Sequence, residues 1–286
     1  MGDRLFVMLQ YLLPQHLISR AVGWLAQSTI PAIKDPFIRT FIKRFNVNMD
    51  EADRQHPSEF ESFNDFFTRS LKADARAIDQ DPAHLACPVD GAISQIGNIK
   101  DGDIFQAKGH KFDLATLLGG DKELAAPFVD GKFATIYLAP KDYHRIHMPC
   151  DATLTHMIHV PGKLFSVNQA TAAMVPGLFA RNERVVAIFD TQLGPMAMVL
   201  VGAMIVASVE TVWAGLVCPK GHAVSHFNYT NQAPIKLKKG EEMGRFKLGS
   251  TVVMCLPKDS IDWPKELSAG TTTRLGQMLA TLTTQS

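Results

Sequence analysis

Apolar positions in the first part of the chain recur at the spacing of amphipathic helices. One stripe begins behind Pro14 and a second follows Pro36, and proline is typical of a helix start. The stripes consist of Leu17, Ile18, Ala21, Val22, Trp24 and Leu25, and of Phe37, Ile38, Phe41, Ile42 and Phe45. A third apolar segment, with Phe60, Phe63, Phe66, Phe67 and Leu71, is predicted to pack inward. We therefore predict a helical region over residues 1–72.

The pattern changes after about residue 86, where short apolar runs are bounded by Gly, Pro, Asp and Asn. Runs of this length with turn residues between them predict antiparallel strands. The expected strands cover residues 132–138, 154–160, 185–189, 196–209 and 251–256, and a short helix is expected over 273–282. The predicted fold class is α+β, mainly β, with a β-rich domain over residues 73–286.

Composition agrees with a folded protein, because 46% of the residues are hydrophobic and 20% are charged. The formal net charge of +1 gives no strong signal for nucleic-acid binding. The charge is uneven, however: residues 1–45 hold six basic and two acidic side chains, a balance of +4, against −3 over the rest.

The basic residues of the second helix lie on the face opposite its phenylalanines. Arg39, Lys43 and Arg44 oppose the Phe37/Phe41/Phe45 stripe. An apolar face beside basic side chains suits an anionic lipid surface. The alternative is that the stripes dock on the protein's own core, as amphipathic helices usually do.

Cysteine usage and hydropathy bear on the location of the protein. The four cysteines, Cys87, Cys150, Cys218 and Cys255, are far apart and form no C-x-x-C pair, which favours a reducing compartment. The longest apolar run, residues 196–209, is shorter than the roughly 20 residues needed to cross a bilayer. We expect no spanning segment, whereas peripheral membrane contact stays open.

Ten histidines raise the question of a metal site. His144/His147, His156/His159 and His222/His226 have ligand-like spacings. In a strand, residues i and i+3 point to opposite faces and chelate poorly, and no H-E-x-x-H motif is present. We therefore expect no metal site from these spacings.

Two short segments carry groups suited to acid–base chemistry. Asp142, His144 and His147 cluster just after the predicted strand 132–138, where functional side chains often gather. The alternative is a solvated turn that begins at Pro140. Asp90 lies in the turn-like sequence C-P-V-D-G, where an aspartate commonly serves the turn alone.

A third segment, L-G-S-T at 248–251, precedes a predicted strand. Gly249 has no Cβ, so the hydroxyl of Ser250 can approach the preceding carbonyl, and the backbone can adopt a strained conformation there. The alternative is an ordinary junction between a turn and a strand.

Taken in order, these segments resemble phosphatidylserine decarboxylase proenzymes of the bacterial type. The resemblance runs from about residue 4 to residue 256. It rests on DYHRIHMP at 142–149 and LGST at 248–251, together with SFNDFFTR at 62–69, PGKLFSVN at 161–168, NERV at 182–185 and KGEEMGRF at 239–246.

The resemblance implies self-cleavage between Gly249 and Ser250 into a β chain, 1–249, and an α chain, 250–286. In that chemistry the Ser250 hydroxyl attacks the Gly249 carbonyl to give an ester, and β-elimination and hydrolysis then leave a pyruvoyl group in place of Ser250. Serine needs a base to act as a nucleophile. By similarity His147 is that base, and Asp90 orients it.

The resemblance also implies the mature reaction, decarboxylation of phosphatidylserine to phosphatidylethanolamine and CO2. The amine of the substrate forms a Schiff base with the pyruvoyl group, which replaces pyridoxal phosphate as the electron sink. We predict that His144 supplies the proton that the substrate carbon then needs.

A lipid substrate changes the interpretation of the N-terminal helices, and we then favour membrane contact for them. The resemblance further implies a homodimer of cleaved αβ protomers, peripheral on the cytoplasmic side of the cell membrane. It also implies a core like the barrel-sandwich hybrid folds. Two alternatives remain: a zinc hydrolase that uses the histidine pairs, and a non-catalytic membrane-binding β module.

Overall fold

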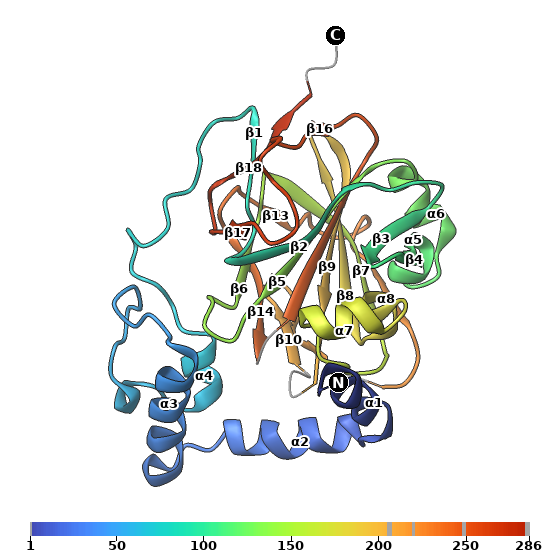
Figure 1. Cartoon of the computed structure of the whole chain (residues 1–286). Helices are drawn as coiled ribbons and strands as arrows, with labels where there is room; N and C mark the ends of the chain where they lie inside the picture. Colours follow the sequence, from blue (N-terminus) through green and yellow to red (C-terminus); the bar gives the residue numbers. More distant parts are fainter. Residues whose placement is uncertain (1, 205–207, 219–220, 248–249, 284–286) are drawn as a thin grey trace.

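The computed structural model describes residues 2–204, 208–218, 221–247 and 250–283, with the main chain alone at Ser250. The chain begins with helices and continues as a β core (Figure 1). The N-terminal elements are α1 (Gly2–Leu12), α2 (Gln15–Ala26), α3 (Pro31–Phe45), the 3-10 turn η1 (Pro57–Glu59) and α4 (Phe63–Phe67). None of the helices within the described residues is both long and apolar enough to cross a membrane.

Helix α3 packs its phenylalanines inward. Its Phe37 ring stacks on Phe63 with centroids 4.2 Å apart, and Phe41 meets the edge of Phe63 at 5.0 Å. Phe63, Phe66 and Phe67 in α4 are buried, as the sequence predicted. Phe45 is 36% exposed. The expectation that this stripe faces lipid is therefore wrong for Phe37 and Phe41, because α4 supplies an aromatic surface that covers them.

The largest sheet has nine antiparallel strands. In spatial order they are β12 (Ser225–Asn228), β7 (Ala152–Val160), β8 (Arg184–Thr191), β9 (Gly194–Val201), β15 (Ser250–Leu256), β5 (Lys132–Leu138), β2 (Gly91–Asn98) and β17 (Thr272–Thr273), with β13 (Lys236–Leu237) also paired to β7. Among the described strands the order ends at β12 and β17, so no closed barrel forms.

Three smaller sheets surround it. They are β11 (Gly215–Cys218), β10 (Ser208–Thr211), β14 (Glu242–Lys247) and β6 (Arg145–His147); β1 (His84–Ala86), β18 (Met278–Leu282) and β16 (Ile261–Asp262); and β3 (Asp103–Ala107) with β4 (His110–Asp113). The short helices are α5 (Leu114–Leu117), α6 (Lys122–Ala125), η2 (Ala126–Phe128), α7 (Gln169–Met174) and α8 (Leu178–Arg181).

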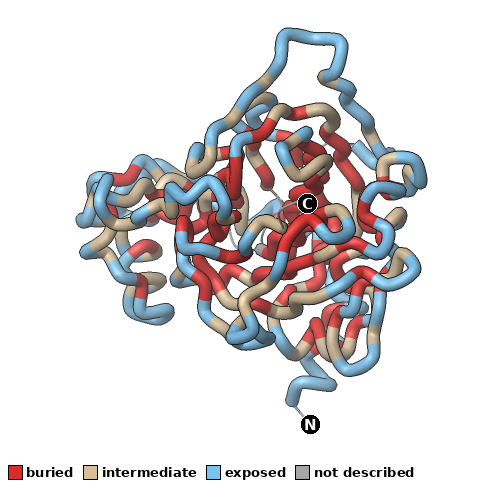
Figure 2. Tube along the Cα trace, turned by 90° about the horizontal axis from the view of Figure 1, so that it is seen from above, coloured by how far each residue is buried: buried red, intermediate tan, exposed pale blue. Residues whose placement is uncertain are grey.

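Buried residues gather in the interior of the molecule (Figure 2), and the central sheet has an apolar cluster on each of its two faces. Successive side chains of β15 alternate between two apolar clusters, one on each face of the sheet. Val253 and Cys255 belong to the cluster that includes the phenylalanines of α4, and Val252 and Met254 belong to the other. A strand that is covered on both faces has a nearly continuous run of apolar residues in its sequence. This is why the sequence signal for β15 and its neighbours was clear.

The antiparallel, mainly β prediction is confirmed, and the predicted strand at 132–138 coincides with β5. The predicted run at 196–209 is instead divided between β9 and β10, and residues 205–207 lie outside the described part of the chain. The predicted C-terminal helix is wrong, because this segment contains β17 and β18. Leu279 and Ala280 become buried when β18 pairs with β1, and such long-range pairing overrides local propensity.

Candidate functional site

Two neighbouring strand connections bring the sequence motifs together. Strand β5 ends at Leu138, and the turn that follows leads into β6. Strand β14 pairs with β6, and β15 pairs with β5 so that Ser250 lies opposite Leu138. The Phe246 amide also donates to the His144 carbonyl at 3.0 Å. The start of β15 therefore lies beside the turn of DYHRIH, although Gly249 and the Ser250 side chain lie outside the described part.

The turn after β5 is held by its own aspartate. Asp142 accepts a hydrogen bond from the Ala139 amide on Oδ2 at 2.7 Å, and its amide donates back to the Ala139 carbonyl at 2.9 Å. Burial raises the pKa of the Asp142 carboxyl above its usual value. This turn is therefore a fixed, partly buried support for the two residues that follow it, rather than a solvated loop.

His147 has a defined tautomer. Its Nδ1 lies 2.8 Å from the Gly240 carbonyl oxygen, which can only accept, so Nδ1 carries the proton. Nε2 is then the basic nitrogen, and it accepts from the Tyr143 hydroxyl at 3.1 Å. Burial lowers the pKa of His147 below its ordinary value of 6.5. The ring is therefore neutral at pH 7, and Nε2 is available as a base.

Asp90 is held by an arginine in this structure. Arg76 donates to it through Nε at 2.9 Å and Nη2 at 2.5 Å, and the Leu275 amide donates at 2.8 Å. The hydrogen bonds of the described residues include none between Asp90 and His147. The two are nevertheless neighbours, because the His147 amide donates to the Pro88 carbonyl at 2.9 Å, and the Asp90 charge raises the pKa of His147 slightly against burial.

His144 is fully buried. Its Nδ1 donates to the Asp142 carbonyl at 2.8 Å, and its ring lies against Phe67 with centroids 4.0 Å apart. Nε2 has no hydrogen-bond partner. Burial, with a smaller contribution from the Arg69 charge, lowers the pKa of His144 to about 3. His144 is thus a neutral acceptor here, and its role as a proton donor stays a prediction for the processed protein.

Two arginines near the site escaped the sequence reasoning. Arg76 neutralises Asp90, and Arg69, which is 3% exposed, donates to the Lys141 carbonyl at 3.1 Å. Arg69 keeps its Nε and Nη1 without partners, and burial lowers its pKa to about 10. The sequence feature that could have indicated Arg69 is its position at the end of SFNDFFTR. An arginine next to phenylalanines that are predicted to be buried is itself expected to be buried, and a buried charge usually has a structural or functional role.

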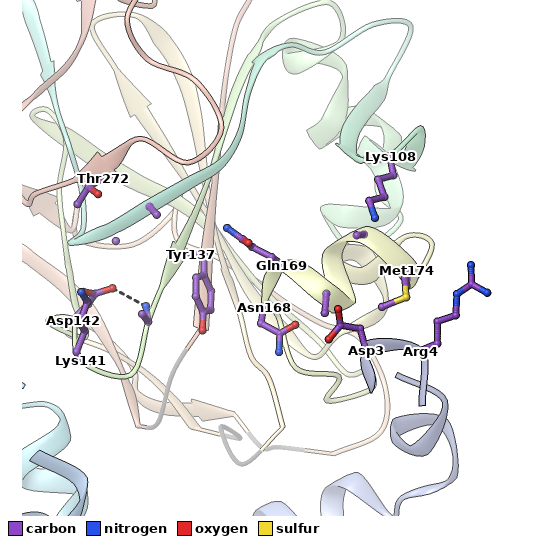
Figure 3. Close-up of a pocket in the computed structure, with 15 residues that line it drawn as sticks. Asp3, Arg4, Lys108, Tyr137, Lys141, Asp142, Asn168, Gln169, Met174 and Thr272 are labelled. Carbon is purple, nitrogen blue, oxygen red and sulfur yellow. Dashed lines mark hydrogen bonds between the residues drawn. The ribbon is translucent and has the colours of Figure 1, made fainter. Parts of the chain in front are cut away.

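A large cavity adjoins the start of β15 (Figure 3). It has a volume of about 960 Å³, and Tyr137, which pairs with Thr251, and Ala139 form part of its wall. Figure 3 shows Lys141 and Asp142 on one side and residues of α7 and α1 on the other. Three cationic side chains line it, namely Arg4, Lys108 and Lys141, together with two carboxyl groups, those of Asp3 and Asp142. The cavity beside the start of β15 therefore suits a polar ligand, with one more cationic than acidic side chain in its wall.

The three histidine pairs do not form metal clusters among the described residues. The group that does bring ligand atoms together is His159, Glu183 and Cys218, which no sequence spacing indicated.

Comparison with known proteins gives concordant results over nearly the whole chain. A family model for phosphatidylserine decarboxylase matches residues 63–281, and a second, described as PSD, matches residues 5–46. The chain is 57% identical over 282 residues to a phosphatidylserine decarboxylase proenzyme of Pseudomonas putida (strain W619), covering 98% of each. It is 60% identical over 277 residues to that of Hahella chejuensis, covering 97% of this chain and 93% of the relative. It is 58% identical over 286 residues to that of Pseudoalteromonas atlantica, covering 99% and 100%.

Proposed function

The chain belongs to the phosphatidylserine decarboxylase family, and we propose that this proenzyme matures by cutting its own backbone between Gly249 and Ser250. It is a decarboxylase whose substrate is phosphatidylserine. Neither the zinc hydrolase nor the non-catalytic module finds support among its relatives. The observation that carries the cleavage proposal is the pairing of Ser250 with Leu138, which brings the serine main chain beside the turn before His144 and His147.

In the proposed first step, His147 Nε2 accepts the proton of the Ser250 hydroxyl. The serine oxygen bonds to the Gly249 carbonyl carbon, the peptide C–N bond breaks, and the Ser250 nitrogen takes the proton from His147. Tyr143 now donates to Nε2, so its hydroxyl must either give way to the serine hydroxyl or relay the proton. His147, neutral again, accepts the Ser250 α-proton, the bond between the serine Cβ and the ester oxygen breaks, and Gly249 leaves as a carboxylate. One water then hydrolyses the resulting dehydroalanine to the pyruvoyl ketone and ammonia.

A pyruvoyl group at position 250 fits the surroundings of β15. It would form the new N-terminus of a central strand, next to the cavity wall that Tyr137 and Ala139 provide. When present, it supplies an electrophilic ketone and an electron sink for loss of CO2. Lys108, Lys141 and Arg4 would attract the anionic headgroup, and His144 lies on the same turn as Lys141.

We keep the proposed membrane contact for α2, extend it to α1, and withdraw it for the inward face of α3. These two helices expose large apolar side chains, among them Met8 at 66%, Leu12 at 82% and Trp24 at 79%. The buried Gln10 and Gln15 side chains fasten the helices to the β core by accepting from the Ser166 and Leu164 amides at 2.8 and 2.7 Å. A firmly docked pair of helices with an uncovered apolar face supports a peripheral location.

The cytoplasmic side and the homodimer are two further proposals. The first rests on the four buried cysteines, which suit a reducing compartment. The homodimer rests on the resemblance alone. Analytical ultracentrifugation of the processed protein in detergent tests it directly.

We expect replacement of Met8, Leu12 and Trp24 by serine to reduce binding to vesicles containing phosphatidylserine. Full burial of a large apolar side chain contributes about 1.5–3 kcal/mol, so binding should fall at least about tenfold. Cosedimentation measures this. The matched control replaces Val212, Leu216 and Phe227, which are also exposed but lie on the β core. Equal losses in both variants would contradict the assignment of this face. Deleting residues 1–45 is a poorer test, because it would uncover Phe63.

We expect His144→Ala to separate maturation from turnover. Cleavage should continue, because His147 and Asp90 remain, whereas CO2 release should fall by about two to four orders of magnitude, as for loss of a general acid. His144→Asn is the control for packing, since its amide can still donate to the Asp142 carbonyl. Near-normal turnover of the cleaved alanine variant would remove His144 from the reaction, and failure to cleave would assign it to maturation.

A further inference from the structure

We propose that His159, Glu183 and Cys218 bind one divalent transition-metal ion, with zinc the best match. His159 lies near the end of β7, Glu183 directly precedes β8, and Cys218 is the last residue of β11. One ligand-type atom from each side chain lies within 4.8 Å of the others. The three residues lie outside the turn that carries His144 and His147, and the proposed metal site does not depend on the proposed cleavage.

All three side chains are removed from solvent. His159 and Cys218 are 2% exposed and Glu183 is 4% exposed. His159 Nε2 lies 2.9 Å from Glu183 Oε1, but His159 Nδ1 and Glu183 Oε2 have no hydrogen-bond partner. Leaving a carboxylate oxygen buried and unpaired is costly. A cation at this position would remove that cost.

The charges of the surroundings leave room for a cation. Within the described residues, the salt-bridge-distance contact of Glu183 with a basic side chain is limited to the one with His159, which is an ion pair only when the ring is protonated. The next residue, Arg184, directs its guanidinium elsewhere, to the carbonyls of Leu117, Asn182 and Thr116. A zinc ion with one thiolate, one carboxylate and a neutral imidazole is a neutral unit, which is the state that burial favours.

The donor set and its geometry also favour zinc. Thiolate, imidazole and carboxylate are the ligands that zinc takes in proteins, and its bond lengths of about 2.0–2.3 Å separate tetrahedral ligands by about 3.3–3.8 Å. Shifts of about 1 Å would bring the three atoms into that range. A fourth position can hold water, because Glu183 also lines a pocket of about 340 Å³. The side chains of His16, Arg20 and His222 line the same pocket.

A metal here would join two sheets. Cys218 belongs to the sheet of β11, β10, β14 and β6, whereas His159 belongs to the nine-stranded sheet. Strand β14 in the first sheet pairs with the strand that carries His147. The ion would therefore fix the position of the smaller sheet against the larger one, and its expected effect is on stability.

Metal binding is tested on the purified full-length protein after removal of metals with a chelator. We expect one equivalent of Co²⁺ per chain with a thiolate-to-cobalt charge-transfer band, displaced by Zn²⁺, and a melting temperature that rises with free Zn²⁺. Cys218→Ala should lose the band, and His159→Gln and Glu183→Gln should lose stoichiometric binding. The matched controls, Cys150→Ala and His156→Gln, should keep both.

Circular dichroism and the melting transition verify that each variant is folded. If Cys218→Ala does not fold, the His159 and Glu183 variants, which keep the size of the side chain, decide the question. Absence of stoichiometric Co²⁺ or Zn²⁺ binding by the wild-type protein would overturn the proposal. So would folded Cys218→Ala, His159→Gln and Glu183→Gln variants that bind metal as the wild type does.

Discussion

Replacing Ser250 with alanine is expected to leave one uncleaved chain with no decarboxylase activity. The variant lacks the oxygen that must attack the Gly249 carbonyl, and it also lacks the atoms from which the pyruvoyl group is made. No other residue can supply both, so the loss should be complete rather than partial. A denaturing gel with intact mass spectrometry shows whether chains 1–249 and 250–286 are formed, and CO2 release measures the reaction.

The neighbouring residue provides the control. Thr251 is fully buried in β15, and its hydroxyl has no hydrogen-bond partner. Thr251→Val removes that hydroxyl while keeping the shape of the side chain, and cleavage should proceed. Normal cleavage of Ser250→Ala, or cleavage at another bond in the wild-type protein, would refute the assignment of Ser250.

Cleavage need not separate the two products. Strand β15 lies between β9 and β5 in the middle of the large sheet, and β18 pairs with β1. The segment after residue 250 is also bound to the catalytic aspartate candidate, since the Leu275 amide donates to Asp90. Arg274 adds an ion pair to Glu51 at 2.8 Å. The α segment is therefore held by backbone pairing and by charge after its covalent link is lost.

The sequence predicted the elements of the core better than their surroundings. Strands β5 and β15 are apolar on both faces, so their signal was strong. The helical spacing of Phe37 and Phe41 correctly predicted one apolar face for α3, but periodicity does not say what covers such a face. Only the fold shows that α4 covers it. The same limit explains the C-terminal error, because β18 depends on a partner strand far away in the sequence.

The sequence allowed the candidate site residues to be named, but it did not allow their hydrogen-bond partners to be predicted. DYHRIH and LGST lie about a hundred residues apart in the sequence, and antiparallel pairing of β15 with β5 brings the main chain of Ser250 and Thr251 beside the strand that leads into DYHRIH. The partners that define protonation were not visible in the sequence. The Gly240 carbonyl fixes the His147 tautomer, and Arg76 holds Asp90. Every residue has a backbone carbonyl, so a contact made by one cannot be predicted from the residue type. The sequence contains many arginines, and it does not show which of them pairs with Asp90.

Loss of the His147 side chain should slow maturation by about two to four orders of magnitude, the contribution of a general base. The pH dependence of the wild-type precursor provides a second readout. Only neutral His147 can accept the serine proton, and burial lowers its pKa below 6.5. The cleavage rate should therefore be at its plateau at pH 7.5 and above, and it should fall to half of that plateau only below pH 6.5, as Nε2 becomes protonated. Precursor made by pulsed cell-free synthesis allows both measurements.

Asp90→Asn should also slow cleavage, and its effect should not add to that of His147→Ala if the two residues act as one unit. The hydrogen bonds of Asp90 to Arg76 and Leu275 suggest a competing role in stability, which thermal unfolding of the variant measures. Arg76→Lys keeps the positive charge but loses the two-pronged contact, so it tests whether Asp90 must be held in place.

Cleavage of His147→Ala at the wild-type rate, or a wild-type rate that is halved already above pH 6.5, would exclude His147 as the base. A folded Asp90→Asn variant that matures normally would restrict the function of Asp90 to holding Arg76 and the α segment.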